Sequence, residues 1–133
     1  MAMIKIEKIE IRKDKRGFSA TPVDENSLKK GKALNLHVVS MNPGAVRGNH
    51  YHKKQSEIIW IIGGPCSVTS KNRESGEEEK ITISPENDTL LTIPPEITHA
   101  IKNISDEVAY LLCYSNHSVS EDDNDVFRDE IVK

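Results

Sequence analysis

The sequence predicts a single all-β domain folded as a sandwich or barrel. Its 133 residues suffice for one domain with a modest core. Short runs of apolar and β-branched residues recur along the chain, and clusters of Gly, Pro, Asn and Ser separate most of them. Strands with such regular turn signals are typical of a sandwich or barrel and argue against strands that alternate with helices.

Nine strands and at most two helices are expected. Segment 3–12 alternates apolar and charged residues, which predicts one strand with a wet face, and the slip at Glu7-Lys8 predicts a bulge or bend within it. Eight further strands are expected at 34–40, 50–52, 57–62, 67–70, 80–83, 89–93, 99–104 and 108–114. Only residues 24–32 and the acidic tail have a composition compatible with a helix.

The strand 57–62 is apolar on both parities, so both of its faces need cover. The inward set is Glu57, Ile59 and Ile61, and the outward set is Ile58, Trp60 and Ile62. We expect the partner of a homodimer to cover the outward set. The alternative is that the second sheet or the N-terminal segment covers it. Trp60 is expected to pack rather than to bind a sugar.

The charge balance excludes some classes of partner. Eighteen basic residues face twenty-one acidic ones, and segment 121–130 alone holds six acids and one base. The body of the chain is therefore nearly neutral and offers no basic surface for nucleic acid or an anionic membrane. Neither a long apolar run nor a signal-peptide pattern is found, so we expect a cytoplasmic protein.

The two cysteines and the acidic tail receive ordinary interpretations. Cys66 and Cys113 lie in apolar, strand-like runs and are expected to be buried, reduced thiols. The acidic tail, residues 118–133, is expected to be solvated and mobile. The alternative is that Val126, Phe127 and Ile131 pin a short segment across the barrel, where it would cover the mouth, or onto a partner.

Two distant motifs, 44–64 and 88–103, together supply four candidate metal ligands. Alternate residues of a strand share a face, so His50 and His52 point the same way and can bind one ion. Glu57 and His99 would complete a shell of three histidines and one carboxylate. Such a shell suits one divalent transition metal (zinc, iron, manganese, nickel or copper) better than magnesium or calcium.

The spacing of these motifs resembles that of the cupin family. The first motif, Gly-x5-His-x-His-x4-Glu-x6-Gly, is met at every position from Gly44 to Gly64. The second keeps Pro94, His99 and Asn103, with Asp88 and Glu96 where glycines usually stand. The resemblance implies one double-stranded β-helix, or jelly roll, spanning residues 1–133 with the ion inside the barrel mouth. The departures affect only local turn geometry, which glycine eases by permitting positive φ.

Further residues narrow the resemblance to sugar-nucleotide biosynthesis. Segments 47–53 (Arg-Gly-Asn-His-Tyr-His-Lys) and 14–18 (Asp-Lys-Arg-Gly-Phe) look like the C-terminal cupin domains of capsular-polysaccharide sugar epimerase-reductases. Keto-sugar ketoisomerases are similar as well. The resemblance implies epimerisation or isomerisation of a nucleotide-linked keto-deoxysugar. The chain has no Gly-x-Gly-x-x-Gly after a strand, so we expect no dehydrogenase activity from it.

Such a reaction removes a proton next to a carbonyl and needs both a base and a group that stabilises the enolate. A histidine bound to metal cannot also accept a proton. If all four ligands bind metal, the base must be another group, and Tyr51, Tyr110 or Tyr114 is the candidate by motif. If the site lacks metal, His50 or His52 can serve directly.

Two more residues of the first motif are candidates for substrate binding. The planar guanidinium of Arg47 suits the diphosphate of a nucleotide sugar, although it could equally pair with a carboxylate of the barrel rim. Asn49 is the second candidate. Lys53 and Lys54 are expected to be solvated turn residues, and His37 and His117 receive no role.

Three function classes remain open from the sequence alone. They are a keto-sugar epimerase or isomerase, a metal-dependent cupin oxygenase, and a non-catalytic sugar-binding or small-molecule-binding module. A shared fold does not decide among them, because cupin folds host unrelated chemistries.

Overall fold

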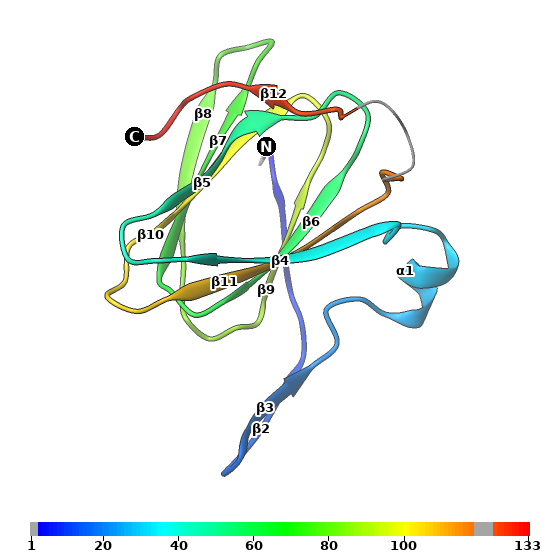
Figure 1. Ribbon diagram of the computed structural model, residues 1–133, viewed down its shortest axis with the longest axis vertical. Helices are drawn as coiled ribbons and strands as arrows, with labels where there is room; N and C mark the ends of the chain where they lie inside the picture. The colour runs from blue at the N-terminus through cyan, green and yellow to red at the C-terminus, as the bar shows by residue number, and fades with distance from the viewer. Residues whose placement is uncertain (1–2, 119–123) are drawn as a thin grey trace.

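Two five-stranded antiparallel sheets make up the body of the protein in the computed structural model, which describes residues 3–118 and 124–133 (Figure 1). The first sheet has the order β1 (Lys5–Lys8), β9 (Thr89–Ile93), β6 (Glu57–Ile62), β11 (Ala109–Ser115) and β4 (Asn35–Met41). The second has the order β12 (Phe127–Arg128), β5 (Val46–Tyr51), β10 (Ile97–Asn103), β7 (Cys66–Asn72) and β8 (Glu78–Ile83). The chain crosses repeatedly from one sheet to the other, as in a jelly roll, which confirms the predicted fold class.

The strands from residue 34 onward agree closely with the prediction. The strands β6 and β9 have the predicted bounds, and the other six expected strands differ by a few residues at their ends. The largest difference is in β5, which begins at Val46 and ends at Tyr51, one residue before His52. Strand ends depend on pairing partners, which short apolar runs do not specify.

The N-terminal region differs from the prediction. The expected single strand over 3–12 is two strands, because β1 pairs with β9 whereas β2 (Ile11–Asp14) pairs with β3 (Gly17–Ala20). Strand β1 ends at Lys8, at the slip in the alternation, and the β2–β3 hairpin projects away from the barrel (Figure 1). Strand β3 was not expected.

Helix α1 (Glu25–Lys29) is the only helix within residues 3–118 and 124–133. It begins after Asp24, whose carboxylate accepts a hydrogen bond from the Ser27 N–H at 2.7 Å, as an N-cap does. It is shorter than the predicted 24–32, and the described part of the tail is not helical. None of the described helical segments is long and apolar enough to cross a membrane.

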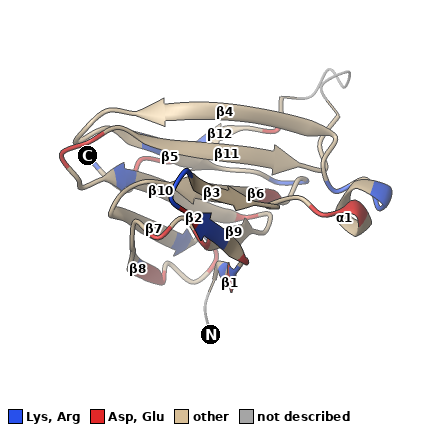
Figure 2. Ribbon diagram, turned by 90° about the horizontal axis from the view of Figure 1, so that it is seen from below, with Lys and Arg blue, Asp and Glu red and all other residues tan. Residues whose placement is uncertain are grey.

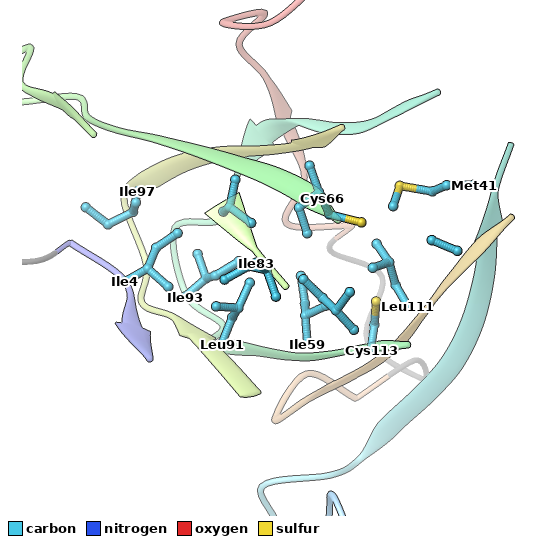
Figure 3. Close-up of a cluster of buried hydrophobic side chains, with 14 residues drawn as sticks. Ile4, Met41, Ile59, Cys66, Ile83, Leu91, Ile93, Ile97, Leu111 and Cys113 are labelled. Atoms are coloured by element: carbon cyan, nitrogen blue, oxygen red, sulfur yellow. The ribbon is translucent and has the colours of Figure 1, made fainter. Parts of the chain in front are cut away.

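The main core lies between the two sheets (Figure 3). Its fully buried members come from both sheets and include Ile59, Ile61, Leu91, Ile93, Val68 and Ile101. Cys66 and Cys113 belong to this core as free thiols, which confirms the prediction for both. Burial and the nearby Glu57 charge raise the pKa of Cys113 to about 12, so this thiol is unreactive at neutral pH.

A second apolar cluster lies on the outer face of the first sheet. Trp60, Leu90 and Tyr114 form it, and Ile9, Ile11, Ala20, Val23 and Ala33 of the N-terminal region pack against it. Trp60 is only 8% exposed, and its Nε1 donates a hydrogen bond to the Asn87 carbonyl at 2.7 Å. The N-terminal segment therefore covers this face. The prediction that a dimer partner covers Trp60 is wrong, and the alternative is confirmed.

Candidate metal centre and its cavity

The two motifs meet because β5 and β10 are antiparallel neighbours in the second sheet, with His50 opposite His99. Gly48 allows this close pairing, since a Cβ on it would lie 2.6 Å from the His99 carbonyl oxygen and its φ is +98°. Glu57 begins β6 in the facing sheet, and His52 follows the end of β5.

The four predicted ligands come together between the sheets. One ligand atom from each of His50, His52, Glu57 and His99 lies within 4.8 Å of all the others. The His52 Nε2 atom is 3.0 Å from Glu57 Oε2. His52 and His99 are 3% and 2% exposed, so the cluster is not an incidental group of surface side chains.

Backbone carbonyls fix the orientation of two of these histidines. His52 Nδ1 lies 2.8 Å from the Asp125 carbonyl oxygen, and His99 Nδ1 lies 3.2 Å from that of Ile97. A carbonyl has no proton to donate, so the proton must be on Nδ1 in both contacts. The Nε2 atom of His99 is then left for a metal, whereas that of His52 faces the Glu57 carboxylate and becomes a ligand once it gives up its proton; Nε2 ligation with Nδ1 held by a carbonyl is the usual arrangement of metal-bound histidine. This donor set fits a divalent transition metal.

The electrostatics of the site also suit a cation. Burial lowers the pKa of His50 and lowers that of His99 to about 4, so both rings are neutral near pH 7. Burial alone would lower the pKa of His52, but its bonds to Glu57 and Asp125 outweigh burial and raise it. Burial alone would raise the pKa of Glu57, but His52 and the other imidazoles lower it. Only His52 must lose a proton before all four groups can act as ligands.

A cavity of about 310 Å³ adjoins the ligands. His50, Glu57 and His99 line it together with Arg47 and His37. His37 was given no role from the sequence, although its position in β4, two residues before Val39, places it on the inward parity. Strand parity could therefore have identified it.

Arg47 lies in the wall of the cavity, as its assignment to substrate binding requires. Its Nη2 donates a hydrogen bond to the Ser40 carbonyl at 3.1 Å. Over the part of the chain that the structure describes, no carboxylate lies within ion-pair distance of its guanidinium, so the alternative of a rim carboxylate is not observed. The remaining donors of Arg47 are available to a ligand.

The tyrosines do not reach the cavity. The Tyr114 hydroxyl donates to the Pro22 carbonyl at 2.9 Å within the outer cluster. The Tyr51 ring stacks on Phe127, with centroids 5.3 Å apart, and the Arg73 guanidinium lies 3.7 Å from the Tyr51 centroid. This geometry does not support either tyrosine as an acid–base group. The physical reason is strand parity, since Tyr51 lies between His50 and His52 and therefore points to the other face.

Asn49 also points away from the cavity. Its Oδ1 accepts hydrogen bonds from the backbone N–H groups of Ile131 and Val132, and its Nδ2 donates to the Val132 carbonyl. These contacts occupy the amide with the C-terminal segment, which does not support the assignment of Asn49 to substrate binding.

The C-terminal segment is ordered against the second sheet over residues 124–133. Strand β12 pairs with β5, with Phe127 opposite Tyr51 and Arg128 opposite His50 (Figure 1). The expectation of a solvated tail is wrong for these residues, and the alternative of a pinned segment is correct for Phe127, although Val126 is 44% exposed. Residues 119–123 lie outside the described residues.

At or next to both positions where the second motif usually has glycine, the backbone still adopts a positive φ. Glu96 stands where the motif has glycine, and it adopts φ +70°. Its backbone N–H donates to the His52 carbonyl at 2.7 Å, and its side chain pairs with Arg73 at 2.9 Å. At the other departure the positive φ, +65°, falls on Asn87, one residue before Asp88. The segment 14–18 lies in the projecting hairpin, where Arg16 pairs with Asp14 at 2.6 Å.

Two facing antiparallel sheets with three histidines and a glutamate between them define a cupin jelly roll. The sequence comparison extends this class to a family. The chain belongs to the polysaccharide biosynthesis C-terminal domain family, whose model matches residues 12–127.

A curated relative supports the assignment. The chain is 26% identical over 129 residues to the spore coat polysaccharide biosynthesis protein SpsL of Bacillus subtilis (strain 168). The match covers 92% of this chain and 84% of the relative.

Solved structures share the fold. The capsular polysaccharide assembling protein CapF from Staphylococcus aureus matches with a TM-score of 0.68 and 20% identity over 94% of this chain, which spans 33% of that protein. The dTDP-4-dehydrorhamnose 3,5-epimerase from Sulfolobus tokodaii matches with a TM-score of 0.70 and 25% identity, covering 89% of this chain and 72% of the epimerase. The sugar 3,4-ketoisomerase QdtA from Thermoanaerobacterium thermosaccharolyticum, in complex with TDP, matches with a TM-score of 0.75 and 18% identity. The match covers 96% of this chain and 88% of the ketoisomerase.

Proposed function

We propose that this chain is a metal-binding epimerase or isomerase that moves a proton at the carbon next to the carbonyl of a nucleotide-linked keto-deoxysugar. The observation that carries the proposal is the convergence of four ligand atoms within 4.8 Å beside a cavity of about 310 Å³. The guanidinium of Arg47 and the imidazole of His37 also line that cavity, and such a proton transfer uses a cationic group and a base.

His50, His52, Glu57 and His99 would hold one divalent transition metal such as zinc, iron, manganese or nickel. When bound, such an ion polarises a carbonyl oxygen and stabilises the enolate. The chain contributes the orientation of the rings, since carbonyls hold His52 and His99 through Nδ1. Glu57 contributes a carboxylate whose lowered pKa keeps it anionic.

His37 is the base that this geometry favours. It lines the same cavity and does not belong to the ligand cluster, so its ring nitrogen is available to accept a proton. In this step the C–H bond next to the carbonyl breaks, an N–H bond forms on His37, and the electron pair becomes the enolate. Delivery of a proton from water to the opposite face, with loss of the His37 proton to water, gives an epimer, and return of the His37 proton to another carbon gives an isomer.

The substrate class rests on the relatives and on Arg47. SpsL is described as a polysaccharide biosynthesis protein, and the 3,5-epimerase acts on dTDP-4-dehydrorhamnose. A nucleotide sugar carries a diphosphate, and the free donors of Arg47 in the cavity wall suit phosphate oxygens.

Deuterium exchange tests the reaction. A panel of dTDP-linked and UDP-linked keto-sugars is incubated with the metal-loaded protein in heavy water, and exchange next to the carbonyl is followed by NMR. We expect His37→Asn to slow exchange by about 10²–10⁴-fold while substrate binding persists. The matched control is His117→Asn, because His117 does not line the cavity. Its exchange rate should equal that of the wild type.

Arg47→Ala should weaken substrate binding by about 1.5–3 kcal/mol through loss of a charge-assisted contact. The control Lys80→Ala removes a cation from β8 at the far edge of the second sheet and should have no effect. A panel that shows no exchange contradicts the proposal, whether or not the sugars bind. Oxygen consumption with bound iron would then indicate an oxygenase, and binding without exchange would indicate a binding module.

A further inference from the structure

The C-terminal segment, residues 124–133, is attached to the strand that carries the first two histidines. Asn49 is 7% exposed and lies between Gly48 and His50. Its Oδ1 accepts the N–H groups of Ile131 and Val132 at 2.9 and 3.0 Å, and its Nδ2 donates to the Val132 carbonyl at 2.9 Å. Three hydrogen bonds from one buried amide hold this end of the segment in a single register.

The same segment is attached to the strand of the fourth ligand. The Thr98 hydroxyl, which is fully buried and adjacent to His99, donates to Asp129 Oδ2 at 2.6 Å. The Asp129 backbone N–H donates to the Asn49 carbonyl at 2.8 Å. The segment therefore bridges β5 and β10 beside the ligands that these strands carry.

Asp125 connects this bridge to a ligand. Its carboxylate accepts the backbone N–H groups of Lys53, Lys54 and Gln55 at 2.9, 3.1 and 3.0 Å, which fixes the loop between His52 and Glu57. Asp125 is 2% exposed and adopts φ +43°, a region that Asp and Asn tolerate better than most residues. Its own carbonyl is the acceptor for His52 Nδ1 at 2.8 Å.

We propose that Asp125 is a positioning residue that holds the His52 ring with its proton on Nδ1 and with Nε2 directed at the other ligands. The carboxylate anchors Asp125 to the 53–55 loop, and this anchor places the carbonyl at the ring. The assignment rests on the proposed metal site only for its functional consequence, which is tighter metal binding. The ring orientation itself is a property of the protein with or without metal.

The contacts that only hold the C-terminal segment in place differ from the contact that Asp125 makes with His52. The contacts of Asn49 and Thr98 can hold the segment in place, but their side chains bond to Ile131, Val132 and Asp129 and not to an imidazole of the cluster. The carbonyl of Asp125 is the contact that keeps a proton on Nδ1 of His52 while Nε2 faces Glu57. Outer contacts of this kind commonly change metal affinity by about 10–100-fold.

The test uses the Nδ1 proton of His52, observed as a ¹⁵N-coupled signal by NMR in metal-free and zinc-loaded protein. Five full-length or shortened chains are compared: wild type, Asp125→Ala, Asp125→Asn, Glu130→Gln and a chain ending at Ser118. Glu130→Gln is the matched control, since it removes a carboxylate of the same segment that pairs with the exposed Arg128. Zinc affinity is measured in parallel by competition with a chelating dye, and circular dichroism verifies that each variant is folded.

We expect a slowly exchanging Nδ1 proton in the wild type and in Glu130→Gln. In Asp125→Ala and in the shortened chain its exchange should accelerate by about tenfold or more, as expected for loss of a hydrogen bond. Zinc affinity should fall by about 10–100-fold in the same two proteins and be unchanged in Glu130→Gln. Asp125→Asn keeps one acceptor oxygen and the backbone preference, so it should restore part of both properties.

Absence of the slow Nδ1 signal from the wild type, or its persistence in the folded shortened chain, would overturn the proposal. Equal zinc affinity in wild type and Asp125→Ala would overturn its functional part. If the wild type itself bound no zinc, the proposed metal function would fail, whereas the Nδ1 signal of the metal-free proteins would still decide the positioning role. If Asp125→Ala does not fold, the comparison of Asp125→Asn with Glu130→Gln decides in its place.

Discussion

The N-terminal and C-terminal regions each cover one part of the barrel, but they do so with different chemistry. In the N-terminal region, Ile9, Ile11 and Val23 pack against Trp60 and its neighbours on the outer face of the first sheet. The C-terminal segment contacts the second sheet mainly through hydrogen bonds of Asn49, Thr98 and Asp125. One cover is apolar and the other is polar.

This difference separates stability from positioning. Apolar burial contributes in proportion to the area removed from water and has no preferred direction. Hydrogen bonds contribute about 1 kcal/mol each to net stability but fix distances and angles. We therefore expect changes in the N-terminal cover to alter the free energy of unfolding most, and changes in the C-terminal cover to alter ligand geometry most.

The largest expected effect is on the apolar side. Trp60→Ala should lower the free energy of unfolding by about 3–5 kcal/mol, because it empties the centre of the outer cluster. Zinc affinity of the folded protein should be unchanged, since Trp60 lies on the face opposite the ligands. Urea unfolding followed by circular dichroism measures the first quantity. Leu28→Ala on α1 is the control, because Leu28 is 58% exposed and should cost less than about 0.5 kcal/mol. A similar cost for both variants would refute the distinction.

On the polar side, Thr98→Val keeps the side-chain shape and removes the bond to Asp129. A hydrogen bond to a charged group contributes about 1.5–3 kcal/mol, and the partial exposure of Asp129 favours the lower end of that range. Hydrogen exchange should accelerate at the Ile131 and Val132 amides while the amides of the first sheet keep their protection. Thr82→Val, on an exposed position of β8, is the control. Unchanged exchange at 131 and 132 would show that Thr98 does not hold the segment.

Tyr114 gives the apolar cover a pH dependence. Burial and the charges of Asp24 and Glu7 raise the pKa of Tyr114 to about 12. Because the pKa of Tyr114 is higher in the folded than in the unfolded chain, the neutral phenol contributes its full stabilisation below the unfolded pKa of about 10. That contribution is lost as pH rises toward 12. Tyr114→Phe should cost about 1 kcal/mol at neutral pH through loss of the bond to Pro22. It should also flatten the decline of stability between these pH values, whereas Tyr110→Phe, at a 44% exposed position, should keep the decline.

The smallest expected effect on the stability of the single chain is at β4. Leu34, Leu36 and Val38 are 56%, 59% and 59% exposed, β4 is an edge strand, and β4 and β11 carry no charged residues in Figure 2. A homodimer stays a prediction, and this face now replaces Trp60 as its interface.

Light scattering should give twice the 14.9 kDa chain mass for the wild type and the single-chain mass for Leu36→Asp. The stability of the separated chain should change by less than about 0.5 kcal/mol. Lys80→Asp, on the edge strand β8 of the other sheet, should stay dimeric. A wild type of single-chain mass at micromolar concentration would contradict the dimer.

The sequence predicted the parts of the site that have a local signature. Apolar runs predicted β6 and β9 to the residue, and motif spacing predicted that His50, His52, Glu57 and His99 converge. The signal within each motif is short range, because strand period and ligand spacing are read over a few residues, whereas the meeting of the two motifs was predicted from the resemblance to cupins.

The remaining features depend on distant polar contacts, for which the sequence has no comparable signal. Asp125 meets His52 across 73 positions, and Asn49 meets Val132 across 83, through hydrogen bonds that leave no periodic pattern. The choice of Tyr51 as an acid–base group followed its proximity to the motif, although strand parity argued against it. The same parity pointed to His37.

The contact between Asp125 and His52 also has a consequence for biosynthesis. All four candidate ligands are synthesised before residue 125, and residues 131 and 132 must follow before their hydrogen bonds to Asn49 can form. An ion that meets the barrel before these residues are in place therefore encounters a His52 ring that lacks its contact with the Asp125 carbonyl. Metal acquisition during translation and acquisition by the finished chain should accordingly differ in selectivity, with the second having the more rigid set of donors.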